Sequence, residues 1–300
     1  MSPKVSFDLP EKVKILGING SPRIGGNTAS MVKYTLEWAE KMGYAETEYV
    51  ALADHKWYQC TGCMQCFGYM APAQDPYQCY QFPDDGIKDI APKIAGCDGL
   101  LLAFPVYTGG VPAIFRAFHE KLHHFAPMSF TQHAGALKYK AMAVISQGGQ
   151  LYGGQEVTYY NLARMGISQG MFVAASWPTA DAPMPQSTFS GGIITTIDGS
   201  TIYGKNAWRK EATRTVPPAQ GSRNERTLKN LGRWLAVGAM RMKLGRLAFE
   251  AAGIEEPDLI PFTNYSVKPK KGSHVDKLMK EGRVTFVSQN DLQERKKVKS

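Results

Sequence analysis

The chain has 300 residues, of which 43% are hydrophobic and 20% charged, a composition that excludes a mainly disordered protein. No stretch approaches the roughly 18 apolar residues of a membrane span. The first residues lack the apolar segment of a secretory signal, so we expect a cytoplasmic protein.

The net charge of +9 is unevenly distributed, because residues 201–300 alone hold 21 basic and 10 acidic side chains. This basic third lacks the interleaved aromatics, glycine repeats or reading module of nucleic-acid binders. A solvated extension, or one that docks an acidic protein partner, is therefore favoured over a nucleic-acid-binding role.

Strand-like and helix-like segments alternate through the first 176 residues. The strands are continuous apolar runs and the helices are amphipathic, which predicts a parallel sheet covered on both faces, a doubly wound α/β fold. The expected strands cover 13–19, 47–52, 99–104, 140–146 and 171–176, and the expected helices cover 28–42, 84–94, 111–125 and 156–165.

Residues 177–223 interrupt this alternation with a stretch rich in Pro, Gly, Ser and Thr. Asp198-Gly199, between 193–197 and 200–203, predicts a β-hairpin, which has too little core of its own and should pack on a neighbouring subunit or the ligand site. A basic amphipathic helix is expected over 224–252, packed on the sheet. We therefore divide the chain into a core at 1–176 that includes a cysteine-rich loop at 57–83, an insertion at 177–223, and a C-terminal helix and basic tail at 224–300.

The loop after the first strand, Gly20-Ser21-Pro22-Arg23-Ile24-Gly25-Gly26-Asn27-Thr28, has the composition of an anion site. Glycines let successive N–H groups face one point at the positive end of the following helix. Ser21, Asn27 and Thr28 add side-chain donors and Arg23 adds charge, which suits a single phosphate. The loop matches neither the Walker pattern nor the dinucleotide-binding pattern.

Two further loops follow the third and fourth strands. One contains Pro105-Val106-Tyr107-Thr108, whose aromatic ring can lie flat against a planar ligand, and the other contains Ser146-Gln147-Gly148-Gly149. Because the carboxyl ends of parallel strands meet at one edge of a sheet, the three loops should converge on one crevice. Together they predict a planar cofactor that carries a phosphate.

Four of the five cysteines lie close together in the sequence. Cys60, Cys63 and Cys66 form a C-x-x-C-x-x-C pattern and Cys79 follows after twelve residues. Thiolates at successive three-residue steps suit one compact [4Fe–4S] cluster, whereas zinc usually takes two separated C-x-x-C knuckles. Zinc and a redox-active thiol pair remain as alternatives. The long gap before Cys79 leaves Cys97 as a reserve fourth ligand, although a lone cysteine there also suits a core position.

These loops together resemble the flavodoxin-like, NADPH-dependent FMN reductase superfamily, and the cysteines resemble its iron–sulfur flavoprotein branch. The similarity covers residues 12–176. It implies that Ser21, Pro22, Arg23, Asn27 and Thr28 hold the FMN phosphate. Pro105, Val106, Tyr107, Thr108, Ser146, Gln147, Gly148 and Gly149 would hold the isoalloxazine ring.

The resemblance implies a flavoprotein with FMN and a [4Fe–4S] cluster, ligated by Cys60, Cys63, Cys66 and Cys79. It would transfer electrons between a low-potential donor such as ferredoxin and a second protein or small-molecule acceptor, with no acid–base residue required. Two alternatives are an NAD(P)H-dependent FMN or quinone reductase, and a zinc-stabilised flavin-binding interaction module. We expect a homo-oligomer, either a dimer or a tetramer, with no membrane contact.

Overall fold

The computed structural model describes residues 10, 12–63, 65–67, 77–126, 135–149, 153–174, 179–181, 193–195, 223–253, 271, 277, 280 and 281. Its strands are β1 (Val13–Asn19), β2 (Ala45–Ala51), β3 (Gly99–Pro105), β4 (Ala141–Gly148), β5 (Phe172–Val173) and β6 (Ile193–Thr195). Its helices are α1 (Asn27–Glu40), α2 (Ile87–Gly96), α3 (Ala113–His119), α4 (Gln155–Ser168) and α5 (Arg223–Ala251), with 3-10 turns η1 (Leu52–Asp54), η2 (Gln65–Phe67) and η3 (Leu122–Phe125).

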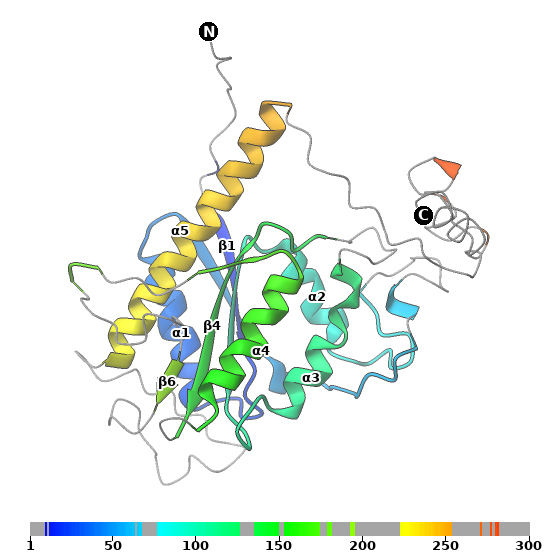
Figure 1. Ribbon diagram of the computed structural model, residues 1–300, viewed down its shortest axis with the longest axis horizontal. Helices are drawn as coiled ribbons and strands as arrows, with labels where there is room; N and C mark the ends of the chain where they lie inside the picture. The colour runs from blue at the N-terminus through cyan, green and yellow to red at the C-terminus, as the bar shows by residue number, and fades with distance from the viewer. Residues whose placement is uncertain are drawn as a thin grey trace, which may run out of the picture.

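The strands form one parallel sheet in the order β2-β1-β3-β4-β5, which confirms the predicted doubly wound α/β fold. Helices α2, α3 and α4 cover one face of the sheet, and α1 and α5 cover the other (Figure 1). Successive residues of a strand point to opposite faces of the sheet. Leu100 and Leu102 of β3 pack with α2 and α3, whereas Leu101 packs with α1 and α5. Burial on both faces explains why every residue of β3 is buried.

Helix α5 packs on the sheet beside α1, as its amphipathic pattern predicted. Leu228, Leu231 and Leu235 are fully buried in the layer between α5, α1 and the strands. The helix therefore completes the core rather than extending from it, although the sequence set it apart from residues 1–176. Its basic side also has partners, because Arg233 forms two hydrogen bonds of 2.7 and 2.9 Å to the Asp181 carboxylate. No helix among the described residues is long and apolar enough to cross a membrane.

The crossing of α1 and α5 depends on Gly232. A Cβ atom at this position would lie 2.1 Å from the Thr35 carbonyl oxygen of α1, so Gly232→Ala must separate the two helices. We expect a loss of about 1–3 kcal/mol in the free energy of unfolding, measured by urea denaturation. Gly245→Ala is the matched control, because its Cβ would meet open space, and we expect it to stabilise the helix by about 0.5–1 kcal/mol. Equal effects of the two changes would contradict this packing.

The structure differs from the sequence predictions in two connecting segments. The helix expected over 111–125 is divided into α3 and η3, with Glu120 and Lys121 between them. Residues 193–195, the first strand of the expected hairpin, pair in parallel with β4 from Ser146 to Gly148, a pairing that was not predicted although it lies at the predicted ligand site. Within the described residues, β5 pairs with β4 at Ala141 and Met142, and β6 pairs further along the same strand. The rest of that hairpin, the end of the fifth predicted strand after residue 174 and most of the basic tail lie outside the described residues.

Candidate functional site

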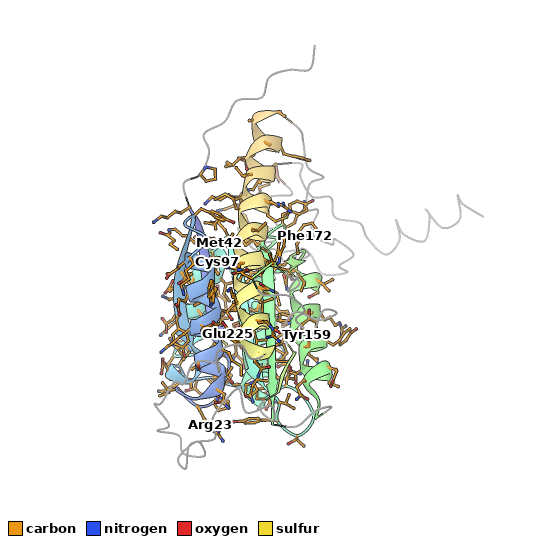
Figure 2. All side chains as sticks on the ribbon, turned by 90° about the vertical axis from the view of Figure 1, so that its left-hand side faces the viewer. Arg23, Met42, Cys97, Tyr159, Phe172 and Glu225 are labelled. Carbon is orange, nitrogen blue, oxygen red and sulfur yellow. The ribbon has the colours of Figure 1, made fainter. Side chains whose placement is uncertain are left out.

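The three loops predicted to bind a cofactor lie together at the carboxyl ends of β1, β3 and β4. The Gly20 N–H donates to the Ala103 carbonyl at 2.8 Å, and the Val106 N–H donates to the Gln147 carbonyl at 2.7 Å. These bonds extend the hydrogen bonding between neighbouring strands by one residue, so the loops begin side by side at one edge of the sheet. Figure 2 shows Arg23 at this end of the molecule and Cys97 toward the other.

The first loop is organised by Asn19, the last residue of β1. Its side-chain oxygen accepts from the Ser21 N–H at 3.1 Å, and its amide nitrogen donates to the Tyr49 hydroxyl at 3.1 Å. The Ser21 hydroxyl in turn accepts from the Arg23 N–H at 3.1 Å. No side chain caps the start of α1, where Thr28 is buried, so the first backbone donors of this 14-residue helix are available to an anion. The donor set therefore fits a phosphate.

The second loop is a tight turn that exposes one aromatic ring. Tyr107 and Gly110 exchange two backbone hydrogen bonds of 2.9 and 3.0 Å, and the Tyr107 side chain is 41% exposed. Thr108, at the turn, has a φ of 49°, which is unusual for a β-branched residue and strains the backbone. Such strain is typical of functional loops, and the two hydrogen bonds to Gly110 fix the backbone of Tyr107.

The second and third loops are in contact. A Cβ atom on Gly154, at the start of α4, would lie 2.3 Å from the Gly109 carbonyl oxygen. At the end of β4, the Ser146 hydroxyl is buried and makes no hydrogen bond to the described residues. The two loops predicted to hold the ring system are therefore adjacent at the carboxyl edge of the sheet.

Removing the side-chain donors of the first loop should weaken cofactor binding. In the variant Asn27→Ala/Thr28→Ala, each lost hydrogen bond to a phosphate should reduce the binding free energy by about 1.5–3 kcal/mol. Fluorescence titration of the cofactor-free protein with FMN measures this loss, and riboflavin, which has no phosphate, is the control ligand. An unchanged preference for FMN over riboflavin would contradict the phosphate assignment.

A separate pocket brings together the four clustered cysteines. Cys60, Cys63, Cys66 and Cys79 all line it, together with Lys121 and His123. Cys97, the reserve candidate, does not: it is buried at the end of α2, where its thiol donates to the Ile94 carbonyl at 3.2 Å. The geometry therefore groups Cys79 with the C-x-x-C-x-x-C cysteines and separates Cys97 from them.

The environment of these thiols suits ligands of a positively charged centre. Burial, and then the proximity of Cys60, Cys63 and Cys79, raises the pKa of the Cys66 thiol to about 12. Several thiolates can share this pocket only when metal ions compensate their charge. The Gly62 N–H donates to the Cys60 sulfur at 3.4 Å, a type of bond that stabilises a thiolate ligand. Within the described residues, no three cysteine, histidine or acidic side chains converge as ligands of a single metal ion would.

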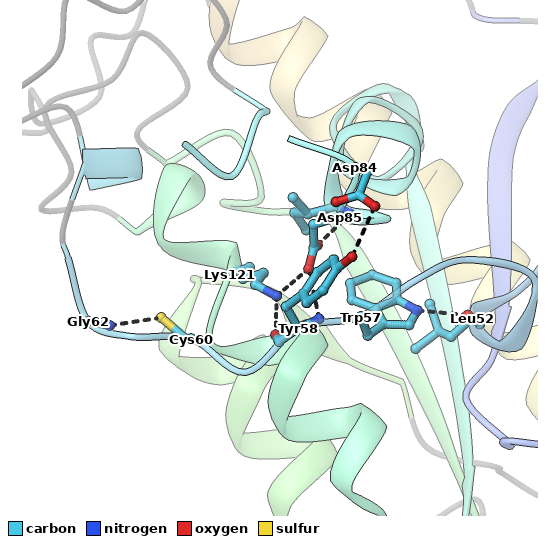
Figure 3. Close-up of polar contacts among 9 residues, drawn as sticks. Leu52, Trp57, Tyr58, Cys60, Gly62, Asp84, Asp85 and Lys121 are labelled. Carbon is cyan, nitrogen blue, oxygen red and sulfur yellow. Dashed lines mark hydrogen bonds and ion pairs between the residues drawn. The ribbon is translucent and has the colours of Figure 1, made fainter. Parts of the chain in front are cut away.

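Asp85 and Lys121 support this pocket, and the sequence reasoning missed their pairing. They form an ion pair in which both side chains are almost fully buried (Figure 3). Asp85 also accepts hydrogen bonds of 3.0 Å from the Tyr58 and Ile87 N–H groups. The sequence showed only two acidic residues at the start of a helix, and nothing in its pattern linked Asp85 to a lysine 36 positions away.

The chain is similar in sequence to several flavoproteins. The profile of the NADPH-dependent FMN reductase family matches residues 13–183. An iron–sulfur flavoprotein of Methanosarcina thermophila is 33% identical over 161 residues, 54% of this chain and 76% of the relative. One from Methanocaldococcus jannaschii is 30% identical over 169 residues, 56% of this chain and 79% of the relative. Among solved structures, RosB with a bound intermediate aligns with 86% of this chain and 92% of its own at 14% identity, with a TM-score of 0.49.

The parallel sheet, the three loops at its carboxyl edge and the family match define an FMN-dependent oxidoreductase. The chain belongs to the NADPH-dependent FMN reductase family, and within it to the branch of the iron–sulfur flavoproteins.

Proposed function

We propose that this flavoprotein holds a [4Fe–4S] cluster on Cys60, Cys63, Cys66 and Cys79, and transfers electrons between a low-potential donor such as ferredoxin and a further acceptor. The observation that carries the proposal is the single pocket lined by all four cysteines in a chain of a flavin-binding family. The two relatives, both named iron–sulfur flavoproteins, support the same assignment.

The arrangement of the cysteines favours a cluster over a single zinc ion. Each cysteine of a [4Fe–4S] cluster binds a different iron, so the four sulfurs stand further apart than the ligands of one ion. Tetrahedral zinc would require all four sulfurs within about 2.3 Å of one point. The C-x-x-C-x-x-C spacing of the first three cysteines lacks the two separated C-x-x-C knuckles that are usual for structural zinc, and all four thiols line one pocket, which supports a cluster.

In this proposal the residues of the three loops bind and orient FMN. Ser21, Arg23 and the start of α1 hold the phosphate, while Tyr107 and the β4 loop at Ser146 hold the ring system. FMN supplies the ability to accept one or two electrons, and the protein sets its position and surroundings. No general acid or base is required for electron transfer itself.

The identity of the electron donor distinguishes this proposal from a second candidate function, that of an NADPH-dependent FMN reductase. The family description favours an NADPH-dependent FMN reductase, in which the cysteines take no part in the reaction. Anaerobic mixing of the protein with NADPH, NADH or reduced ferredoxin, followed by absorbance of the flavin, separates the two. We expect rapid flavin reduction by ferredoxin and slow reduction by either nucleotide. Rapid reduction by NADPH with no response to ferredoxin would establish the second function.

We further propose that the protein assembles as a dimer or tetramer through the outer face of α4. Val157, Tyr160 and Ile167 on this helix are 53%, 64% and 64% exposed, and Phe172 of the neighbouring strand is 53% exposed. An apolar stripe of this kind is typical of an interface between subunits. Light scattering of the full chain tests the proposal, and a monomeric mass would overturn it.

A further inference from the structure

We propose that the buried Asp85–Lys121 ion pair positions the cysteine loop and raises the reduction potential of the cluster held there. This inference rests on the proposed function, because it requires a cluster on Cys60, Cys63, Cys66 and Cys79. Neither residue belongs to the ligand set: Lys121 lines the pocket and Asp85 lies behind it. The pair therefore has a positioning and electrostatic role.

The pair connects three segments that are distant in the sequence. Asp85 accepts hydrogen bonds from the Tyr58 N–H, two residues before Cys60, and from the Ile87 N–H at the start of α2. Lys121, between α3 and η3, donates to both the Asp85 carboxylate and the Tyr58 carbonyl. Figure 3 shows these hydrogen bonds close together, beside the segment of the chain that leads to Cys60. The loop is thus fixed to the protein immediately before its first cysteine.

The orientation of the pair gives it an electrostatic effect on the pocket. Lys121 lines the pocket with the four cysteines, whereas Asp85 lies outside the lining. The side chains are only 4% and 0% exposed, so solvent screens their charges weakly. A cation that faces a cluster favours the form with one more negative charge, which is the reduced form. Lys121 should therefore raise the potential, and Asp85, acting from behind it, should lower it.

The chain offers a matched control in the neighbouring pair Lys56–Asp84. Its nitrogen–oxygen distance is 3.1 Å, but the two side chains are 73% and 51% exposed. Exposed pairs are screened by water and contribute little to their surroundings. Lys56→Met and Asp84→Asn remove the same charges as the substitutions in the buried pair, and Asp84 is the residue next to Asp85. We expect them to have only a small effect on the potential of the cluster.

The test is an anaerobic redox titration of the full chain, followed by electron paramagnetic resonance, with iron content measured on each sample. In Lys121→Met we expect the ratio of reduced to oxidised cluster at a fixed potential to fall at least tenfold, about 59 mV for a one-electron couple. In Asp85→Asn the ratio should rise, and in the double variant it should fall below the wild-type value but stay above that of Lys121→Met. Lys121→Arg should restore the wild-type value, and Lys56→Met and Asp84→Asn should leave it unchanged.

A purely structural role predicts a different result. The single variants would then lose iron and show no opposite shifts in potential. Any single or double variant that retained its iron would titrate at the wild-type potential. Either result overturns the inference. A wild-type protein without iron would instead refute the proposed cluster, so the two failures are distinguishable.

Discussion

Cys79→Ala is expected to remove the proposed iron–sulfur cluster while FMN remains bound. Cys79 lines the same pocket as Cys60, Cys63 and Cys66, so its loss leaves one iron without a protein ligand. We expect iron to fall from about four atoms per chain to less than about one, measured by colorimetric analysis after anaerobic purification. The flavin loops lie outside this pocket, so the FMN absorbance should be unchanged.

Cys97→Ala is the matched control for this experiment. Cys97 is buried at the end of α2 and belongs to the hydrophobic layer on that face of the sheet. Its replacement should cost about 1 kcal/mol of stability through lost packing and leave the iron content intact. Full iron in Cys79→Ala together with loss of iron in Cys97→Ala would contradict the ligand assignment.

Gly154→Ala is expected to disrupt the flavin site without affecting the cysteine pocket. Gly154 has a φ of 105°, which strains any residue with a side chain, and its Cβ would overlap the Gly109 carbonyl oxygen. The second and third loops must therefore separate, and the surface that holds the ring system opens. We expect FMN affinity to fall at least tenfold, about 1.4 kcal/mol, in a fluorescence titration.

Gly96→Ala is the control for that change, because a Cβ on Gly96 would meet no atom within 4 Å. It should leave FMN affinity unchanged. Iron content should remain constant in both glycine variants, since neither residue lines the cysteine pocket. Unchanged FMN affinity in Gly154→Ala would show that the two loops do not jointly form the flavin site.

The centre of the sheet could be predicted from the sequence because β3 and β4 are buried on both faces and β1 is largely buried. β1, β3 and β4 are continuous apolar runs, and continuous runs between amphipathic helices have few other interpretations. Local turn signals were less informative. Asp198-Gly199 suggested a hairpin that leans on a neighbouring subunit or the ligand site, but it did not indicate that the segment at Ile193 pairs in parallel with β4 at Ser146. That pairing joins residues 47 positions apart, Ser146 and Ile193, which no local pattern reveals.

The candidate site was predictable to the extent that its residues are consecutive in the sequence. The three loops follow strands, and the topology of a parallel sheet then brings them to one edge. The groups that support them were not predictable. Asn19 was counted as the end of a strand, yet its side chain orders the first loop through the Ser21 N–H and the Tyr49 hydroxyl. Lys121 had the sequence context of a helix surface but is buried against Asp85.

The most direct test of the whole account is an anaerobic reductive titration of the full chain, with FMN, iron and acid-labile sulfide measured on the same sample. We expect one FMN and about four irons and four sulfides per chain. The protein should then take up about three electrons, one by the cluster and two by the flavin. Uptake of two electrons with stoichiometric zinc and no acid-labile sulfide would contradict the electron-transfer function and leave the FMN reductase alternative.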